Sequence, residues 1–222
     1  SHNVSLTAIW KFITMSVNYT RTDDAIMTWS SPYNDEGAVL VQPRNIETPF
    51  RMMSAFVNLT PTVGRWNLNY TFGVQPQWLT ITVADPREPS GYRETKFNDK
   101  PICFAQLLNT LTLDGGWQFE LGGLVQSKGY SGNLLVTNVY SNVTAAVQKT
   151  MLKDGSLVLR LEGNDILGTT DMNVDSDFGS HTITQTNRMD QQRIKFSVRY
   201  SFNTAQSKYR GTGAGQDSKS RM

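Results

Sequence analysis

The sequence has few of the residues on which many enzymes and metal proteins depend. It contains one cysteine, Cys103, and two histidines, His2 and His181, among 222 residues. A single cysteine excludes an internal disulfide bond. Two distant histidines with no acidic cluster at ligand spacing give no basis for a metal site or a histidine-based catalytic triad. We therefore predict no catalytic residue, no metal and no cofactor, and we do not expect an enzyme.

Long hydrophobic runs and a strong net charge are also absent. The mean hydropathy is -0.39, 38% of the residues are hydrophobic, and the formal net charge is +2. These values exclude a transmembrane helix. They do not exclude a transmembrane β-barrel, because barrel strands distribute their apolar residues in alternation. A net charge near zero gives no reason to expect a nucleic acid partner.

What the chain does contain is alternation with a period of two. The clearest example is residues 192–203, in which every second side chain is apolar from Ile194 to Phe202 and those between are polar. This spacing predicts a β-strand whose two faces meet different environments. Similar runs lie at residues 4–10, 13–20, 53–60, 66–75, 102–113, 117–126, 139–148, 157–162 and 178–189. We predict an all-β protein with about ten long antiparallel strands in an up-and-down meander.

The lengths of the expected connections alternate. Short turns are predicted near residues 11–12, 61–64, 114–116, 153–155 and 190, and longer connections at residues 30–37, 84–100, 128–133 and 163–177. Outer-membrane barrels have short turns at one rim and long loops at the other, whereas the crossings of a soluble sandwich mix lengths at both ends. The pattern favours a transmembrane β-barrel segment.

The aromatic residues are consistent with two membrane interfaces. Trp10, Trp66 and Trp117 each lie beside a predicted short turn, on the apolar face of their strands. Trp78 lies near the opposite end of the strand that begins at Trp66, about 28 Å away along the membrane normal at a tilt of about 45°. Tryptophan and tyrosine favour such interfaces. We expect membrane-interface positions for Trp10, Trp66, Trp78, Trp117, Tyr200 and Phe202, with ordinary core packing as the alternative.

Charged residues are rare on the predicted polar faces. The candidates for a lumen wall are Arg160, Glu162, Lys195 and Arg199. Arg160 and Glu162 form either a strut between strands or part of a substrate surface, and we favour the strut. Most other side chains on these faces are Ser, Thr, Asn or Gly, which are too small to fill the interior of a narrow barrel. We therefore predict an open, curved sheet with unpaired edges at residues 4–10 and 192–203.

Two segments resemble a known family. Residues 200–222 resemble the C-terminus of the Bacteroidetes "outer membrane protein beta-barrel family", whose members are similar to TonB-dependent receptors. The segment 164–167, Asn-Asp-Ile-Leu, resembles a step common before the last hairpin of such receptors. This resemblance implies a protein of the bacterial outer membrane that contacts outer-membrane lipid and takes up an unknown nutrient.

The resemblance also implies parts that lie upstream of Ser1. Such receptors carry an N-terminal plug that contacts the TonB energy-coupling system, followed by a barrel of about 22 strands. We expect residues 1–203 to be the C-terminal part of the barrel and residues 204–222 to be a polar, basic periplasmic tail. A soluble all-β sandwich or jelly roll, with a binding or structural role, is the alternative. An outer-membrane phospholipase is disfavoured because the sequence shows no evident Ser–His pair.

Overall fold

The protein is described by a computed structural model that covers residues 1–34, 37–85, 87–152, 154–179 and 181–202. Within these ranges the regular structure consists of β-strands and one 3-10 turn, η1 (Asp114–Gly116). The described residues include no helix that is long and apolar enough to span a membrane. The all-β prediction is confirmed. The predicted tail, residues 204–222, lies outside the described residues.

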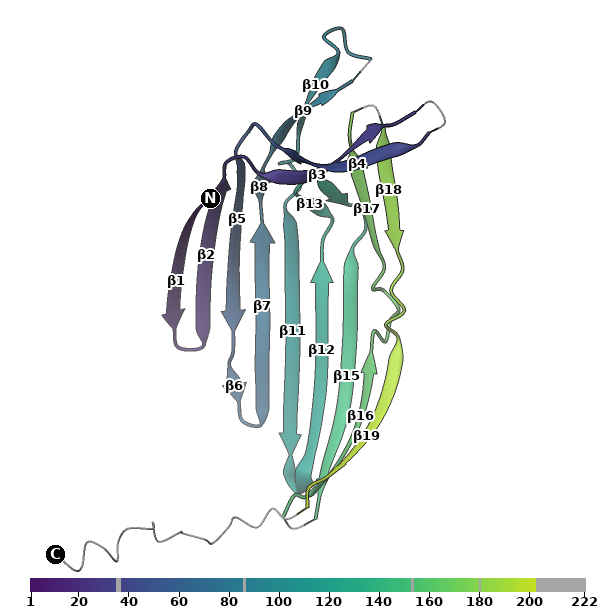
Figure 1. The fold of residues 1–222 in the computed structure, drawn as a ribbon. Coiled ribbons are helices and arrows are strands. Elements are labelled where there is room, and N and C mark those ends of the chain that lie inside the picture. The colour runs from purple at the N-terminus through teal and green to yellow at the C-terminus, as the bar shows by residue number, and fades with distance from the viewer. Residues whose placement is uncertain (35–36, 86, 153, 180, 203–222) are drawn as a thin grey trace, which may run out of the picture.

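Nine long strands form one antiparallel sheet, which we call the wall (Figure 1). They follow the chain order, as a meander requires, and two short strands extend it, β6 (Thr62–Val63) beside β7 and β8 (Gln77–Trp78) beside β5. The wall strands are β1 (His2–Trp10), β2 (Ile13–Thr22), β5 (Phe50–Leu59), β7 (Trp66–Gln75), β11 (Ile102–Leu113), β12 (Trp117–Gln126), β15 (Tyr140–Met151), β16 (Leu157–Asn164) and β19 (Arg193–Tyr200).

The pairing register keeps apolar side chains on one face of the wall from strand to strand. Leu107 of β11, for example, lies between Tyr70 of β7 and Gly123 of β12, whereas its neighbour Leu108 lies between Asn69 and Gly122. Successive residues of a strand point to opposite faces. The wall therefore has an apolar face, which carries Leu107, and a polar face, which carries Leu108.

The one amide on the middle of the apolar face has its partners within the sheet. Asn109 accepts a hydrogen bond from the Tyr70 hydroxyl at 2.6 Å and donates one to the Leu121 carbonyl at 3.3 Å. A buried or lipid-exposed amide is tolerated when its hydrogen bonds are satisfied internally. Asn109 therefore does not interrupt the apolar character of this face.

Connection lengths differ between the two ends of the wall. The β1–β2, β5–β7, β11–β12 and β15–β16 connections gather at the lower end in Figure 1, and the long connections gather at the upper end. We call these ends the short-turn rim and the long-connection rim. The predicted sorting is confirmed with one correction. The turn near Asp190 lies within the long connection between β16 and β19, because residues 178–189 do not form a wall strand.

The long connections are folded rather than polar loops. They contain β3 (Ile26–Pro32) paired with β4 (Val39–Asn45), β9 (Thr80–Ala84) paired with β10 (Tyr92–Lys96), and a sheet of β13 (Gly129–Ser131), β14 (Leu134–Val136), β17 (Met172–Asp177) and β18 (Thr182–Asn187). We call this assembly the cap. Two predictions are therefore wrong. The connections at 84–100, 128–133 and 163–177 contain strands and are not plain loops, and residues 178–189 contribute a strand to the cap and not to the wall.

The principal hydrophobic core lies in the cap. Its buried side chains come from separate connections and are Trp29, Ile46, Leu79, Ile81, Val83, Phe97 and Phe178, with Met27, Phe50, Tyr130 and Ile183 packed against them. Trp29 and Phe178, which are far apart in sequence, meet edge to face with ring centroids 5.1 Å apart. Burial of these apolar groups explains why the connections fold onto one another.

A buried carboxylate connects two parts of the cap. Asp85, after β9, is 2% exposed and accepts hydrogen bonds from Arg87 Nε and Nη2, both at 2.8 Å. Arg87 also donates to the Gly179 carbonyl at 2.8 Å, and Arg93 of β10 pairs with Asp177 of β17 at 2.8 Å. The hydrogen bonds from Arg87 lower the pKa of Asp85 from 3.8 to about 2.

The wall has two free edges among the described residues, β1 and β19, because the strand order does not return from one to the other. The predicted open sheet is confirmed. Among these residues no second sheet covers the apolar face, where Leu121 and Phe196 are 55% and 64% exposed. A sandwich would bury such side chains between two sheets. The fold therefore contradicts the sandwich alternative.

The Asp85 site predicts a specific dependence of cap stability on pH. Because the folded pKa is lowered, the site stabilises the cap above pH 3.8, and this contribution is lost as the pH falls towards about 2. We expect Asp85→Asn to reduce amide protection in the cap at pH 7 and to remove the part of the pH dependence between those two values. Hydrogen exchange of β9, β10 and β17 measures both effects.

Asp171→Asn is the matched control, because Asp171 is exposed and precedes the same cap strand, β17. It should leave both the protection at pH 7 and the acid profile unchanged. Equal pH profiles for the wild type and Asp85→Asn would contradict the assigned role of Asp85.

Candidate functional site: a charged cluster on the polar face

Two neighbouring rows of the polar face bring charged residues together. In one row Glu120 of β12, Ala146 of β15, Glu162 of β16 and Lys195 of β19 follow one another across the sheet. In the adjacent row Arg160 of β16 lies between Gln148 and Ser197. Residues separated by two positions on one strand share a face, so Arg160 and Glu162 are direct neighbours.

Arg160 is the centre of this charged cluster. Its Nη1 and Nη2 donate to the two carboxylate oxygens of Glu120 at 3.0 and 2.7 Å, and its Nε donates to Glu162 at 3.0 Å. The contact with Glu120 crosses over β15, where Ala146 contributes only a methyl group. A bidentate arginine–carboxylate pair has defined geometry as well as charge complementarity. Arg160 thus connects β12 and β16 across the intervening strand.

Two further side chains extend the cluster. Gln118 Nε2 donates to Glu120 at 2.9 Å, and Lys195 Nζ lies 3.7 Å from Glu162. The Arg160 and Glu120 side chains are 27% and 23% exposed, whereas that of Lys195 is 60% exposed. The cluster is therefore held most firmly at Arg160 and is most accessible at Lys195.

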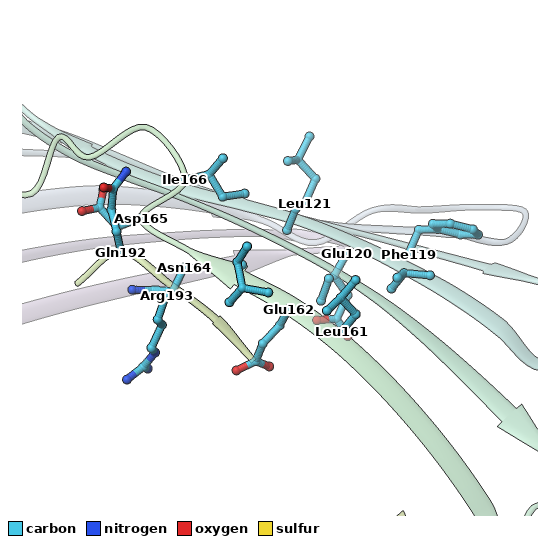
Figure 2. A pocket seen from close by; sticks show the side chains of 15 residues that line it. Phe119, Glu120, Leu121, Leu161, Glu162, Asn164, Asp165, Ile166, Gln192 and Arg193 are labelled. Carbon is cyan, nitrogen blue, oxygen red and sulfur yellow. The ribbon is translucent and has the colours of Figure 1, made fainter. Parts of the chain in front are cut away.

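A small cavity of about 220 Å³ adjoins the charged cluster on the side nearer the long connections. Its polar lining includes Glu120, Thr144, Arg160, Glu162, Asn164 and Arg193. Arg193 and Glu162 extend to one side of the sheet, opposite to Leu121 and Ile166 (Figure 2). The cavity thus offers both carboxylate and guanidinium groups to a polar ligand or to a neighbouring segment.

The structure brings together three of the four charged residues predicted from the sequence. Arg160, Glu162 and Lys195 belong to the cluster, while Arg199 lies one row nearer the short-turn rim, opposite Val158. Among the described residues no hydrogen bond or ion pair joins Arg199 to the cluster. Glu120 and Arg193 were not predicted, although alternation places Glu120 on a polar face. The sequence did not give the pairing register, which places Glu120 opposite Ala146 and, one strand further, in line with Glu162.

The predicted aromatic residues of the short turns occupy one rim of the wall. Trp10 ends β1, whereas Trp66 and Trp117 begin β7 and β12, all on the apolar face. Lysine ammonium groups accompany two of them: Lys11 lies 5.1 Å from the Trp10 ring and Lys149 lies 4.6 Å from the Trp117 ring. Amphipathic rings with adjacent lysines are typical of a boundary between apolar and aqueous phases.

The remaining predicted aromatics divide between the rims. Tyr200 and Phe202 meet edge to face with centroids 4.6 Å apart, near the β15–β16 connection, where the Ser201 amide donates to the Ser156 carbonyl. Trp78 lies in β8 opposite Arg51, at the long-connection rim. The fifth tryptophan, Trp29, is a core residue of the cap.

The Asn-Asp-Ile-Leu segment, residues 164–167, begins at the last residue of β16 and starts the connection to β19. Asp165 is 1% exposed, adopts a positive φ of 48°, and accepts hydrogen bonds from the Thr169 amide at 3.0 Å and the Thr170 hydroxyl at 2.7 Å. Asn164 Nδ2 donates to the Gln191 carbonyl at 2.9 Å. These contacts fix the departure from β16 and the return towards β19, which is a structural role.

The structure also forms a Ser–His pair that the sequence did not suggest. Ser30 Oγ lies 2.9 Å from His181 Nε2, and the His181 ring stacks on Phe178. Ser30 is 2% exposed, so this pair lies inside the cap. Among the described residues no group of three or more His, Cys, Asp or Glu side chains is placed to hold a metal ion.

The network geometry predicts unequal effects for two arginines of the polar face. Arg160→Gln should lower the free energy of unfolding by about 2 kcal/mol, because hydrogen bonds to charged groups are lost. Arg199→Gln should change it by less than about 0.5 kcal/mol, as for a surface site without such contacts. Urea unfolding in lipid vesicles measures both values, and equal losses would contradict the central position of Arg160.

A comparison with protein families matches residues 1–200 to the "Outer membrane protein beta-barrel family". Searches of curated proteins and of solved structures find no match. The match spans the whole wall and cap, and it agrees with the alternating faces, the sorted connections and the open meander. The chain therefore belongs to the outer membrane protein β-barrel family and is located in the bacterial outer membrane.

Proposed function

We propose that the chain is the C-terminal barrel part of a TonB-dependent-receptor-like protein of a Bacteroidetes outer membrane, which takes up a nutrient. The observation that carries the proposal is the charged cluster on the polar face, centred on Arg160. In a barrel whose apolar face meets lipid, this face lines the lumen. Charged residues that are held there by mutual hydrogen bonds can contact a plug inside the barrel and a polar substrate that passes through it.

Within this function Arg160 acts as a strut. Its guanidinium is occupied by two carboxylates, so it keeps β12 and β16 aligned instead of presenting a free charge. Lys195 and Arg193 are the accessible cations beside it. In this proposal they make the transient contacts with the substrate or with a plug that is coupled to TonB.

The cap supports the same proposal. It is folded around its own apolar core at the long-connection rim, which is the external rim in outer-membrane barrels. A prefolded external layer presents a fixed surface to a nutrient before uptake, and less conformational entropy is lost on binding. The aromatic residues of the two rims, from Trp10 to Phe202, lie at the membrane interfaces in this arrangement.

Two adjacent leucines test which face of the wall meets lipid. Leu107 and Leu108 lie at the middle of β11, are 39% and 41% exposed, and point to opposite faces. Leu107→Arg should cost about 2–4 kcal/mol of folding free energy in vesicles, and Leu108→Arg should remain within about 1 kcal/mol of the wild type. Folding titrations into phospholipid vesicles measure the difference, and equal costs would show that the faces are misassigned.

Uptake itself is tested in the native strain with the full-length gene. We expect deletion of the gene, or of TonB, to abolish uptake of at least one of a panel of labelled iron chelates, cobalamin and oligosaccharides. Complementation with the wild type should restore that uptake. Unchanged uptake of the entire panel in both deletion strains would contradict the proposed function.

A further inference from the structure

The apolar face contains a hollow of about 890 Å³ close to the long-connection rim, which we call the wall pit. It arises from one row of side chains that runs Leu121, Ala145, Gly163 and Ile194 across β12, β15, β16 and β19. The two middle residues are small and the two outer residues are large. The floor of the pit is therefore the backbone of β15 and β16, with apolar walls on both sides.

The neighbouring rows close the pit at its two ends. Towards the short-turn rim the next row is Phe119, Val147, Leu161 and Phe196, which are all large. Towards the other rim Ile166 lies over the floor, because a Cβ atom built on Gly163 would be 3.2 Å from Ile166 Cγ1. Figure 2 shows Ile166 and Leu121 rising on the same side of the sheet. Apolar side chains thus bound the pit along β12, along β19 and towards the short-turn rim, whereas its lining towards the long connections also includes Gln192 and Asp165 (Figure 2).

Several apolar side chains around the pit are largely exposed, which is unfavourable in water. Ile194 is 84% exposed, Leu121 is 55% exposed and Ile166 is 48% exposed. A contiguous apolar surface of this kind indicates a binding or membrane surface. Since the chain is a protein of the outer membrane, the medium against its apolar face is the hydrocarbon of lipid chains.

We infer that the wall pit binds one acyl chain of an outer-membrane lipid, in the leaflet nearer the long connections. Protein interiors are close-packed, and an apolar hollow that stays empty likewise loses dispersion contacts along its lining. An acyl chain fills such a hollow through apolar contacts, and in this proposal the lipid headgroup leaves it at the end where Ile166 and Gln192 line the pit. This inference depends on the family membership and not on nutrient uptake.

Photolabelling in vesicles tests the inference. The full chain is folded into vesicles of phosphatidylethanolamine and phosphatidylglycerol that contain a phosphatidylethanolamine with a diazirine in its acyl chain. Mapping of the labelled peptides should show enrichment at residues 157–166 and 193–200 over residues 53–59, a segment of β5 whose alternate side chains also lie on the apolar face. Uniform labelling of the apolar face would mean an ordinary lipid shell and would overturn the inference.

Two alanines of the apolar face provide matched variants. Ala145→Leu fills the pit, and it should reduce the enriched labelling by a factor of about four for each methylene group that it excludes. Ala55→Leu makes the same change on β5, and it should leave the enrichment unchanged. An unchanged pattern in Ala145→Leu would overturn the inference.

A second variant keeps the test possible if the Ala145→Leu protein fails to fold into the vesicles. Ile166→Ser removes a half-exposed side chain that lines the pit, and we expect it to insert and to lower the labelling of residues 157–166. Retained enrichment in this variant would contradict a bounded acyl-chain site. Crosslinks between two protein copies through these residues would assign the pit to self-association and would equally contradict it.

Discussion

The structure depends on keeping a period of two in register across nine strands. A shift of one residue in any pairing would move the apolar set of that strand to the polar face. The observed registers avoid this from β1 to β19, so that Leu107 meets Tyr70 and Gly123 while Leu108 meets Asn69 and Gly122. Between neighbouring wall strands the backbone groups are paired along the same ladders, as a strand that crosses hydrocarbon requires, and only the outer edges of β1 and β19 lack a partner strand among the described residues.

The separation of faces determines where each kind of interaction occurs. Charged groups gather on the polar face around Arg160, where two carboxylates hold the guanidinium. Apolar burial of the globular type is found in the cap, where Trp29, Val83 and Phe178 form a core from separate connections. In the part of the chain that the structure describes, no second sheet packs on the wall to form such a core. The apolar side chains of the wall, Leu121 and Phe196 among them, stay exposed, and the wall pit is a hollow of defined shape on this exposed apolar face.

Sequence patterns predicted the wall well and the cap poorly, and the difference is physical. Alternation is a local property, so the runs around Trp66, Trp117 and Ile194 could be assigned to strands with defined faces. The cap core requires contacts between residues such as Trp29 and Phe178, which no local pattern connects. For the same reason Arg160, Glu162 and Lys195 were predicted as a polar group, whereas their partner Glu120 required the register of β12 and β16 across β15.

The most direct measurement of the central claim is a nitroxide accessibility scan along β12, from Trp117 to Gln126, in lipid vesicles, with Cys103 replaced by serine. Collision rates with oxygen, which concentrates in hydrocarbon, should peak at Phe119, Leu121, Gly123 and Val125. Collision rates with a water-soluble nickel complex should peak at the alternate positions, Gln118, Glu120, Gly122 and Leu124. A scan without this opposed alternation, or with both reagents excluded from the apolar face, would contradict a wall that separates lipid from a polar interior.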